Sequence, residues 1–523
     1  MNSRSINIVD PNMNDENQSL IAEINSSLSL AAKSDHFLRQ NGLFKMISFL
    51  ETCTSSHECT LLEQNCPFWI RTIFQIFENH PVSLHAKLAQ YAFYLIIQIS
   101  KSLSAELQRH ISTSLIEKAI ILLISSSDLL AKNSLLCLNE LISCYRTPCS
   151  QFRSKIENYV YTRLESDSDD MIKWSSICYS KLPYLHKNSN NTDIWYIYFT
   201  NMLHNANSLL NELFEDYQPR LGVDSLDKQD SIEIDHSETI NTSHKGEIRT
   251  FSKFTKDLDN LEFKACLSCL THLLKPLSER TCINVRPSEV IEFLKRIFLF
   301  DFKKLQNNCR INLESNYLDN IMSEMLICAF EFCTEFFSVL NTNLIPQTLI
   351  INNILLNIGH SIAENNTSSV LTSYYACLNS WMVSLGTNSA FYKNSFALIE
   401  NLLKKIRPFE KNAISIESNK YDTSKTRQKQ KASVLFNQEK NSLNTFQIIN
   451  QNKMVTSALD CLRTFLKTFS FNLSYNQFEL LTAFTKIKTN TYNNIWIIKI
   501  IMFNNNVFKS VCEADNILFN LNN

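Results

Sequence analysis

Residues 169–217 read DDMIKWSSICYSKLPYLHKNSNNTDIWYIYFTNMLHNANSLLNELFEDY, and no other stretch is as informative about the fold. Pro183 cannot continue a helix, because it lacks an N–H group and its ring clashes with the preceding turn. The polar run that follows, residues 187–193, is typical of a loop. The pattern therefore predicts two helices joined by a short connection, with the second helix folded back against the first.

Both helices predicted within residues 169–217 gather their large side chains on one face, because residues three and four positions apart share one side of a helix. The predicted face of the first helix consists of Trp174, Ile177, Cys178 and Lys181, and that of the second of Trp195, Phe199, Met202, Leu203, Leu209, Leu210 and Phe214. Such a helical hairpin leaves apolar surface uncovered on both sides, so it requires neighbouring helices.

Glycine is scarce in this chain. Only 5 of the 523 residues are glycine, and none lies between Leu43 and Leu221. Tight sheet turns and phosphate-binding loops both need glycine, because its backbone adopts positive φ without strain. The composition therefore predicts helices joined by short polar turns. It also excludes the glycine-rich dinucleotide-binding loop, the P-loop and the nucleophile elbow.

The apolar pattern of residues 169–217 recurs along the chain. Apolar-periodic segments occupy residues 37–50, 61–77, 84–99, 105–124, 128–145 and 152–164. Each predicted helix pair takes about 40 residues, which is the period of HEAT and armadillo arrays. No consensus sequence repeats, so the pattern alone carries the prediction. The predicted fold is an all-α, HEAT/armadillo-like helical-repeat solenoid in two blocks with polar linkers.

The sequence predicts six parts in this order. They are a disordered N-terminus (1–17), a first helical-repeat domain (18–217), an acidic polar linker (218–257), a second helical-repeat block (258–408), a polar, mildly basic loop (409–445) and C-terminal helices (446–523). The acidic stretch is interpreted as a solvated linker or an inserted loop. The basic stretch is interpreted as a solvated loop, with a nuclear-import or RNA-contacting segment as the alternative.

Four residues mark expected helix ends. Asp128 and Asp169 occupy positions typical of N-caps, and Pro287 is typical of a first helical position. Gly386 follows an apolar-periodic segment and is expected to terminate its helix.

Charge and hydropathy set limits on partners. The formal net charge is −1, which excludes a general electrostatic attraction to nucleic acid but not a local patch. The first 18 residues lack a signal-peptide pattern, and the apolar runs are too short or too interrupted to span a bilayer. We therefore expect a chain that stays inside the cell and has no membrane partner.

Two clusters could in principle bind a metal. Cys266 and Cys269 are followed by His272, but no second cysteine pair lies nearby, and the surrounding leucines indicate a buried helix. The acidic cluster of Asp167, Asp169 and Asp170 precedes a predicted helix, where carboxylates favourably oppose the helix dipole. We interpret both clusters as structural, and the 16 cysteines as mostly reduced core thiols.

No nucleophile has a base placed beside it in the sequence, and the 11 histidines are dispersed. Residues distant in sequence could still converge in a polar pocket with perturbed titrating groups. The sequence favours a protein that is not an enzyme, with no catalytic, cofactor-binding or metal-binding residue and no cofactor. A solenoid of this kind acts through long binding surfaces.

Several motifs resemble the Rix-type pre-rRNA-processing family, whose animal members are proline-, glutamate- and leucine-rich proteins. They are residues 178–183 (CYSKLP), Trp195 after a polar gap, and a leucine-rich helix ending at residues 213–215 (LFE). Residues 285–291 (VRPSEVI) and 375–381 (YACLNSW) continue the similarity. The resemblance covers roughly residues 35–395, in order and at similar spacing.

This resemblance implies a scaffold that supports pre-rRNA processing and maturation of the large (60S) ribosomal subunit. The implied partners are a WD-repeat propeller subunit, a second HEAT-type subunit, a midasin-type AAA ATPase and the pre-60S particle. The implied location is the nucleus, in nucleolus and nucleoplasm. Homodimer formation and direct RNA contact stay open. The family's Leu-x-x-Leu-Leu motifs reduce here to residues 270–274, on a predicted core helix, so no receptor function is carried over.

The alternative function is a solenoid transport receptor or adaptor of the karyopherin kind. It would share the architecture and the absence of catalysis. The two functions differ in what binds: a scaffold copurifies with pre-ribosomal particles and a propeller, whereas a transport receptor binds a Ran-type GTPase.

Overall fold

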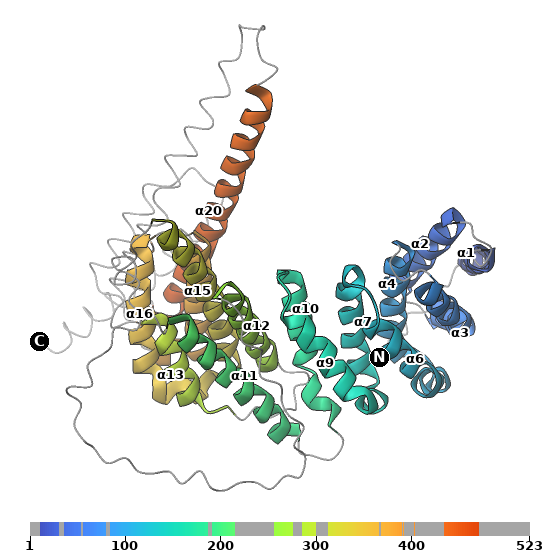
Figure 1. The fold of residues 1–523 in the computed structure, drawn as a ribbon, viewed down its shortest axis with the longest axis horizontal. Helices are drawn as coiled ribbons and strands as arrows, with labels where there is room; N and C mark the ends of the chain where they lie inside the picture. The colour runs from blue at the N-terminus through green and yellow to red at the C-terminus, as the bar shows by residue number, and fades with distance from the viewer. Residues whose placement is uncertain are drawn as a thin grey trace, which may run out of the picture. The chain divides into compact units, whose positions relative to one another are not determined.

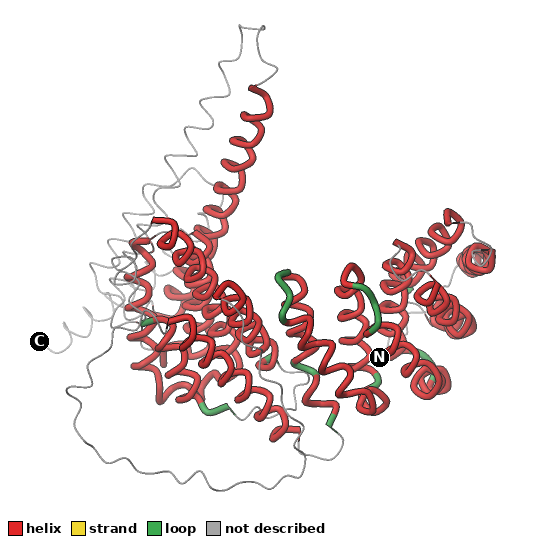
Figure 2. The backbone as a smooth tube through the Cα atoms, in the orientation of Figure 1, coloured by secondary structure: helices red, strands yellow, loops and turns green. Residues whose placement is uncertain are grey.

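The computed structural model describes residues 11–30, 36–53, 56–79, 84–186, 191–214, 256–275, 285–299, 312–365, 368–389 and 433–469, together with residues 391 and 402. Within these ranges the chain forms helices and connecting turns and contains no strand (Figures 1 and 2). The predicted all-α class is confirmed. The chain divides into two compact units, Met1–Val285 and Arg286–Asn523.

The first unit is built from two layers of helices (Figure 1). The first layer contains α1 (Pro11–Leu30), α3 (Ser56–Asn79), α6 (Ile116–Ile124), α9 (Arg153–Leu164) and α11 (Asn191–Phe214). The second layer contains α2 (His36–Thr52), α4 (Leu84–Ile99), α7 (Ala131–Cys144), α10 (Asp169–Tyr179) and α12 (Lys256–Leu274). Each first-layer helix packs on the second-layer helix that follows it in sequence, and second-layer helices also pack on one another in chain order.

Short helical segments complete this unit. They are η2 (Ser100–Ser102), α5 (Ala105–His110), the π-helical turn η3 (Ile111–Leu115), η4 (Asp128–Leu130), α8 (Arg146–Cys149), η5 (Ser150–Phe152) and η6 (Leu182–Leu185). The segment η6 begins one residue before Pro183, so the helix before this proline ends where the sequence predicts.

Neighbouring second-layer helices run parallel. Near the start of α4 and α7, the side-chain amide of Asn133 donates to the backbone oxygen of Lys87 at 3.1 Å, across 46 residues of sequence. Near their ends, the Cys144 thiol donates to the backbone oxygen of Ile97 at 3.7 Å, across 47 residues. The start of α4 thus lies beside the start of α7, and the end of α4 lies beside the end of α7. This offset is somewhat longer than the interval of about 40 residues expected from the sequence pattern.

The prediction that the two helices within residues 169–217 pack on each other as a hairpin is wrong. Helix α10 packs on α9, whereas α11 has α12 as its main partner, and α12 also packs on α10. The indole N–H of Trp195 in α11 donates to the backbone oxygen of Leu273 in α12 at 3.0 Å, across 78 residues. The helix that covers α11 therefore lies beyond the polar stretch, where local periodicity cannot reveal it.

This pairing changes the interpretation of the acidic stretch. The sequence predicts a second block that begins at residue 258, yet α12 packs within the first unit, which extends to Val285. The acidic stretch therefore interrupts a helix pair, as an inserted loop does, and does not divide the two units. Residues 215–255, which hold almost all of this stretch, lie outside the described residues.

Two other predicted boundaries are corrected. Helix α1 begins at Pro11, inside the N-terminus predicted to be disordered, and α20 (Ser433–Phe469) begins inside the predicted loop 409–445. Both sequences are polar, and a polar composition favours a prediction of disorder. Neither contains an internal glycine or proline, and Pro11 is the first residue of its helix, where proline is tolerated.

The second unit contains α13 (Pro287–Phe298), α15 (Asn312–Leu340), η7 (Asn341–Gln347), α16 (Thr348–Asn365), α17 (Ser368–Leu385), η8 (Gly386–Ser389) and α20. Helix α17 packs on both α15 and α20, while α16 packs on α13 and α17. Pro287 begins α13, and Gly386 follows α17 with a φ of +55°, a backbone conformation that glycine adopts without strain. Both of these predicted helix boundaries are confirmed.

An aromatic core fills the second unit. The rings of Phe337 and Trp381 lie 4.7 Å apart, and those of Phe298 and Phe330 stack at 4.9 Å. The buried indole N–H of Trp381 donates to Asn352 Oδ1 at 2.9 Å, so the largest core side chain has its polar group paired.

Among the residues that the structure describes, one helical stretch, Asn320–Ile362, is long and apolar enough to cross a bilayer by length and composition. Half of its most apolar window is buried by other parts of the structure. A core helix of a globular unit meets the same criterion, so this finding is weak evidence for a membrane span.

Some predictions fall outside the described residues. They concern residues 409–432, the helices expected after Phe469, and the helix expected over residues 391–406 apart from residues 391 and 402.

Candidate interaction face

One side of the second layer is open to solvent. Helices α4, α7 and α10 each pack on a first-layer helix and on their neighbours within the layer, so one stripe of each remains uncovered. We call these stripes together the open face. Its residues are exposed or half-buried: Leu84, Lys87, Tyr91, Tyr94 and Gln98 of α4 with Lys101 after it; Lys132, Leu136, Glu140 and Ser143 of α7; and Asp170, Lys173, Trp174 and Ile177 of α10 with Lys181 after it.

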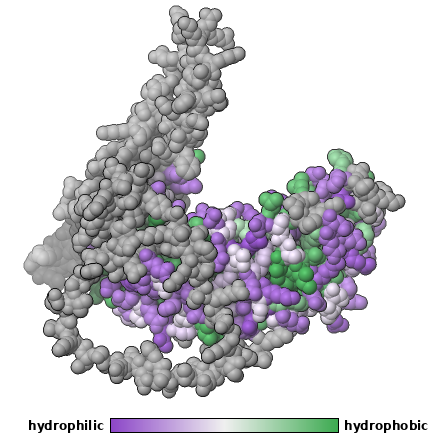
Figure 3. All heavy atoms as spheres, viewed as in Figure 1, coloured by the Kyte–Doolittle hydropathy of each residue, from purple (hydrophilic) through white to green (hydrophobic). Residues whose placement is uncertain are grey.

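The open face mixes residue types. On the side of the molecule drawn in Figure 3, hydrophobic residues gather in places among hydrophilic ones. In α7 the solvent-facing positions, namely Lys132, Leu136, Glu140 and Ser143, recur every three or four residues. The positions between them are mostly buried, on the sides of α7 that face the neighbouring helices. This spacing is the amphipathic pattern expected of a helix covered on all but one side.

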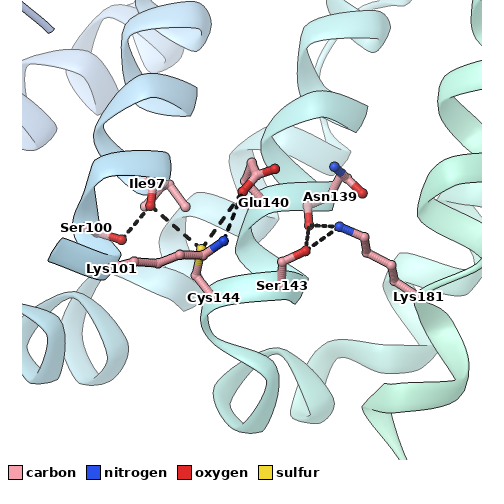
Figure 4. Close-up of polar contacts among 8 residues, drawn as sticks. All are labelled: Ile97, Ser100, Lys101, Asn139, Glu140, Ser143, Cys144 and Lys181. Atoms are coloured by element: carbon pink, nitrogen blue, oxygen red, sulfur yellow. Dashed lines mark hydrogen bonds and ion pairs between the residues drawn. The ribbon is translucent and has the colours of Figure 1, made fainter. Parts of the chain in front are cut away.

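A polar cluster links the helices at one end of the open face (Figure 4). The Lys181 ammonium, which follows α10, donates to the backbone oxygen of Asn139 at 3.3 Å and to the Ser143 hydroxyl. The Lys101 ammonium, which follows α4, lies 3.8 Å from Glu140 Oε2. Helix C-termini carry unpaired carbonyls and partial negative charge, so cations are favoured there. The cluster therefore joins the ends of three parallel helices.

The titration of this cluster follows from its burial. Burial is the main cause that lowers the pKa of Lys181, and the positive charge of Lys101 adds to it, while Glu140 opposes it. Burial raises the pKa of the Cys144 thiol in spite of the nearby Lys101. A thiol with a raised pKa stays protonated at neutral pH and is a poor nucleophile. The contacts of Lys101 and Lys181 therefore hold the three helices together and do not form a reactive site.

The opposite end of the open face carries the acidic residues for which the sequence predicts N-cap roles. Ser127 and Ser168 occupy the N-cap positions, neither with a side-chain capping bond, so the predicted capping by Asp128 and Asp169 is wrong. Both aspartates lie in the first turn instead. A first-turn carboxylate still opposes the helix dipole, and its side chain can reach a neighbouring helix.

These first-turn carboxylates form ion pairs between helices. Asp170 Oδ2 lies 2.7 Å from the Lys132 ammonium of α7, and Asp169 Oδ1 lies 2.6 Å from the Lys264 ammonium of α12. The hydrogen bond from Lys132 is the main cause that lowers the pKa of the Asp170 carboxyl. Asp167, the third member of the predicted acidic cluster, is exposed before α10. Adjacent carboxylates thus bind different lysines and do not converge.

The cysteines of the predicted metal-like spacing lie in the helical core. Cys266 and Cys269 are fully buried in α12, and the Cys269 thiol donates to Ser176 Oγ of α10 at 3.5 Å. Burial raises the pKa of Cys269 to about 12 and lowers the pKa of His272 to about 4. Across the described ranges, no three histidine, cysteine or acidic side chains are grouped as a metal would require. Residues 270–274 contribute buried leucines to the same core.

The predicted apolar face of the first helix is partly wrong. Cys178 is buried as predicted, but Trp174 and Ile177 are half-buried on the open face. The buried side of α10 carries Ile172 and Tyr179 together with two small serines, Ser175 and Ser176, where α10 is enclosed by its neighbours. Small side chains allow close approach of helices, whereas a helical spacing of three and four does not tell which side a core will cover.

The predicted burial of Trp195 is confirmed. Its exposed fraction is 5%, and its ring stacks on that of Phe199 with centroids 5.1 Å apart. This tryptophan lies between α11 and α12 and belongs to the core of the first unit.

Sequence reasoning did not place Tyr91 and Tyr94 on an open face. The rings of Tyr91 and Tyr94 stack with centroids 6.0 Å apart, and the Tyr91 hydroxyl donates to Glu51 Oε1 of α2 at 3.0 Å. A signal was present, because Leu84, Lys87, Tyr91, Tyr94 and Gln98 recur every three or four positions opposite the alanine-rich side of α4.

No family model matches this chain. The chain is similar to Proline-, glutamic acid- and leucine-rich protein 1 of Mus musculus, with 23% identity over 384 residues, covering 70% of this chain and 32% of that protein. It is also similar to the protein of the same name from Xenopus laevis, with 22% identity over 411 residues, covering 74% of this chain and 38% of that relative.

The similarity thus spans about a third of the length of these curated relatives and more than two thirds of this chain. It agrees with the Rix-type motifs of the sequence, since the animal members of that family carry this name. The chain therefore bears a distant family resemblance to the proline-, glutamic acid- and leucine-rich proteins.

Proposed function

We propose that this chain is a non-catalytic helical-repeat scaffold in ribosome biogenesis, which supports pre-rRNA processing and maturation of the large (60S) ribosomal subunit. The observation that carries the proposal is the distant similarity to Proline-, glutamic acid- and leucine-rich protein 1 across 70% of the chain. The Rix-type motifs within residues 169–217 and 285–291 support it.

The architecture supports a scaffold of the HEAT/armadillo kind. Five helix pairs follow one another in the described part of the first unit, with parallel second-layer helices. Contacts between successive second-layer helices span 46 and 47 residues, close to the length of one HEAT-type repeat. Stacked pairs of this kind present an extended face to other macromolecules.

The state of the cysteines supports a non-catalytic role. Burial raises the pKa of Cys66, Cys149, Cys178 and Cys269 to about 12 in each case. Thiols in this state are protonated at neutral pH, whereas a catalytic cysteine needs a lowered pKa. These side chains therefore contribute packing.

The proposed partners are a WD-repeat propeller subunit, a second HEAT-type subunit, a midasin-type AAA ATPase and the pre-60S particle. The proposed location is the nucleolus and nucleoplasm. These proposals rest on the family resemblance, and the matched region is about a third of each relative.

The test is affinity purification of the tagged full chain from its own cells, with mass spectrometry of proteins and sequencing of bound RNA. A tagged, unrelated helical-repeat protein of similar abundance is the matched control. We expect enrichment of a WD-repeat propeller, a midasin-type ATPase and large-subunit rRNA precursors over that control. Enrichment of a Ran-type GTPase with diverse cargo, and without rRNA precursors, would replace the scaffold function with transport.

A further inference from the structure

We propose that the open face of α4, α7 and α10 binds an acidic peptide segment of a partner protein that carries large apolar side chains among its acidic residues. This inference deepens the proposed scaffold role by naming the partner's chemistry, and it rests on that role only in requiring a protein partner. It does not depend on which assembly the partner belongs to.

The middle of the open face is an apolar row. The Cys178 thiol of α10 donates to the backbone oxygen of Leu135 in α7 at 3.1 Å. Ile177 and Leu136, which are adjacent to these residues in sequence, therefore lie at the same level along the two parallel helices. The Cys137 thiol donates to the backbone oxygen of Gln90 in α4 at 3.2 Å and aligns Tyr91 with them in the same way.

The side chains in this row are only half-covered. Tyr91, Leu136 and Ile177 are all intermediate between buried and exposed, as is Trp174, three residues before Ile177 in α10. Amphipathic helices of a monomeric unit usually show charged or polar residues at such positions. Aromatic and aliphatic groups that line up across three neighbouring helices are typical of an interface, where aromatic side chains contribute most of the binding energy.

Lysines flank the apolar row on both sides. Lys87, Lys132 and Lys173 lie toward the N-terminal ends of the three helices, and Lys101 and Lys181 follow the C-terminal ends of α4 and α10. The acidic residues of the open face are Glu140, paired with Lys101, and Asp170, paired with Lys132. Two further carboxylates adjoin the face: Asp169 is paired with Lys264 of α12, and Glu51 of α2 accepts from the Tyr91 hydroxyl. Five lysines therefore lie on the face, and its own two acids, Glu140 and Asp170, each have a lysine partner.

Two of these lysines are available for a partner. Within the described ranges, neither Lys87 nor Lys173 forms a salt bridge, and both are exposed. The Lys173 ammonium lies over the Trp174 ring, 5.9 Å from its centroid, so charge and apolar surface adjoin each other. A carboxylate beside an apolar side chain on the partner would match this pair. The charge pattern therefore selects an acidic, partly apolar segment.

The same features disfavour nucleic acid. The open positions of α4, α7 and α10 include no arginine, the side chain best suited to phosphate. The half-buried Trp174 and Ile177 offer apolar surface, which a peptide side chain covers better than a sugar–phosphate chain.

Fluorescence anisotropy with the full chain tests the proposal. The probe is a labelled peptide of about 12 residues in which glutamates alternate with leucine and phenylalanine. Extended, it spans about 40 Å, enough to cross three helices spaced about 8–10 Å apart. One control peptide replaces the glutamates by lysine, a second replaces the apolar residues by serine, and a single-stranded RNA of equal length is the third.

We expect the acidic–apolar peptide to bind at least about tenfold more tightly than each control, because both the charges and the apolar groups contribute. Equal binding of the serine peptide would reduce the site to a charge effect, and tighter binding of the RNA would assign the face to nucleic acid. Either outcome, or no binding of the probe, overturns the proposal.

A charge-reversed variant locates the site. Lys87→Glu combined with Lys173→Glu changes two exposed side chains without breaking a salt bridge of the described structure, and should weaken peptide binding about tenfold or more. Lys155→Glu changes a lysine that is also exposed, on the first-layer helix α9, and should leave binding unchanged. Circular dichroism and thermal melts of both variants should match the parent protein.

If the double variant binds the peptide as the parent does, the open face is not the binding site. Copurification of rRNA precursors is measured separately, so failure of this inference and failure of the proposed function are distinguishable. If the chain copurifies with rRNA precursors but does not bind the peptide, the proposed function stands and the proposed peptide site is wrong.

Discussion

At the scale of single residues, two tryptophans of the same stretch have different roles. Trp195 is 5% exposed and has its indole N–H bonded to the Leu273 carbonyl, whereas Trp174 is half-buried on the open face. Both follow the same helical spacing in sequence. The difference arises because α12 covers one of them and solvent reaches the other.

This difference predicts unequal stability effects. Trp195→Ala should destabilise the first unit by about 3–5 kcal/mol, through lost burial and the cavity that remains. Trp174→Ala should cost about 1 kcal/mol or less, because a half-exposed side chain leaves no closed cavity. Urea denaturation followed by circular dichroism measures both. Equal losses in the two variants would contradict the assignment of Trp174 to the open face.

His272 predicts a dependence of stability on pH. Burial lowers its pKa to about 4 in the folded protein, against about 6.5 in the unfolded chain. As pH falls from about 6.5 to 4, the unfolded state gains a proton that the folded state does not, so stability is lost in that window. The loss is at most about 3.5 kcal/mol, since one pKa unit is worth about 1.4 kcal/mol.

The measurement is the free energy of unfolding at pH 7.5 and pH 5, for the parent and for His272→Gln. Glutamine is polar and does not titrate, so the variant should lose less stability between the two pH values. All carboxylates are common to both proteins and cancel in the comparison. Identical pH dependence in the two proteins would show that His272 is not a source of the effect.

At the scale of elements, the decisive feature is the pairing of α11 with α12. These helices flank residues 215–255 in sequence and pack on each other in the structure. The side-chain contacts of Lys264 with Asp169 and of Cys269 with Ser176 also connect α12 to α10. A long segment that joins two helices already packed together contributes mainly loop-closure entropy, which changes slowly with length.

Deletion of residues 222–245 should therefore leave the first unit folded, with a free energy of unfolding within about 1 kcal/mol of the parent. Residues 215–221 and 246–255 remain to connect α11 and α12. Thermal melts and soluble yield are the measurements. Loss of soluble expression would mean that the acidic stretch packs against the helices.

At the scale of the whole molecule, the chain consists of two compact units with the boundary between Val285 and Arg286. The sequence predicts the division at the acidic stretch, because a change of composition is the visible sign of a linker. The helix pairs show instead that the first unit is complete only after α12. A fragment that ends where the composition changes would lack one helix of a pair.

The fragment of residues 1–285 should accordingly fold with a cooperative thermal transition, whereas the fragment of residues 1–217 should not. The shorter fragment leaves the apolar sides of α10 and α11 uncovered, including Trp195. Large exposed apolar patches promote aggregation. Circular dichroism melts and gel filtration of the two fragments check this. A monomeric, cooperatively folded 1–217 fragment would contradict the pairing of α11 with α12.

Local sequence patterns were sufficient to predict the helical class and several helix ends. Scarce glycine and apolar residues spaced three and four apart are local properties, so they predict helices, the start of α13 at Pro287 and the stop at Gly386 without knowledge of the fold. The resemblance in residues 169–217 likewise needs no structure, and the two relatives agree with it.

The pairing of the helices, the buried side of α10 and the position of the open face became visible only in the folded chain. The contacts responsible join residues far apart in sequence: 78 residues for Trp195 and Leu273, 93 for Ser176 and Cys269, and 95 for Asp169 and Lys264. Local periodicity shows that a helix has an apolar side. It does not show which other element of the chain covers that side. The covering element depends on packing and burial across the whole unit, which no local pattern contains.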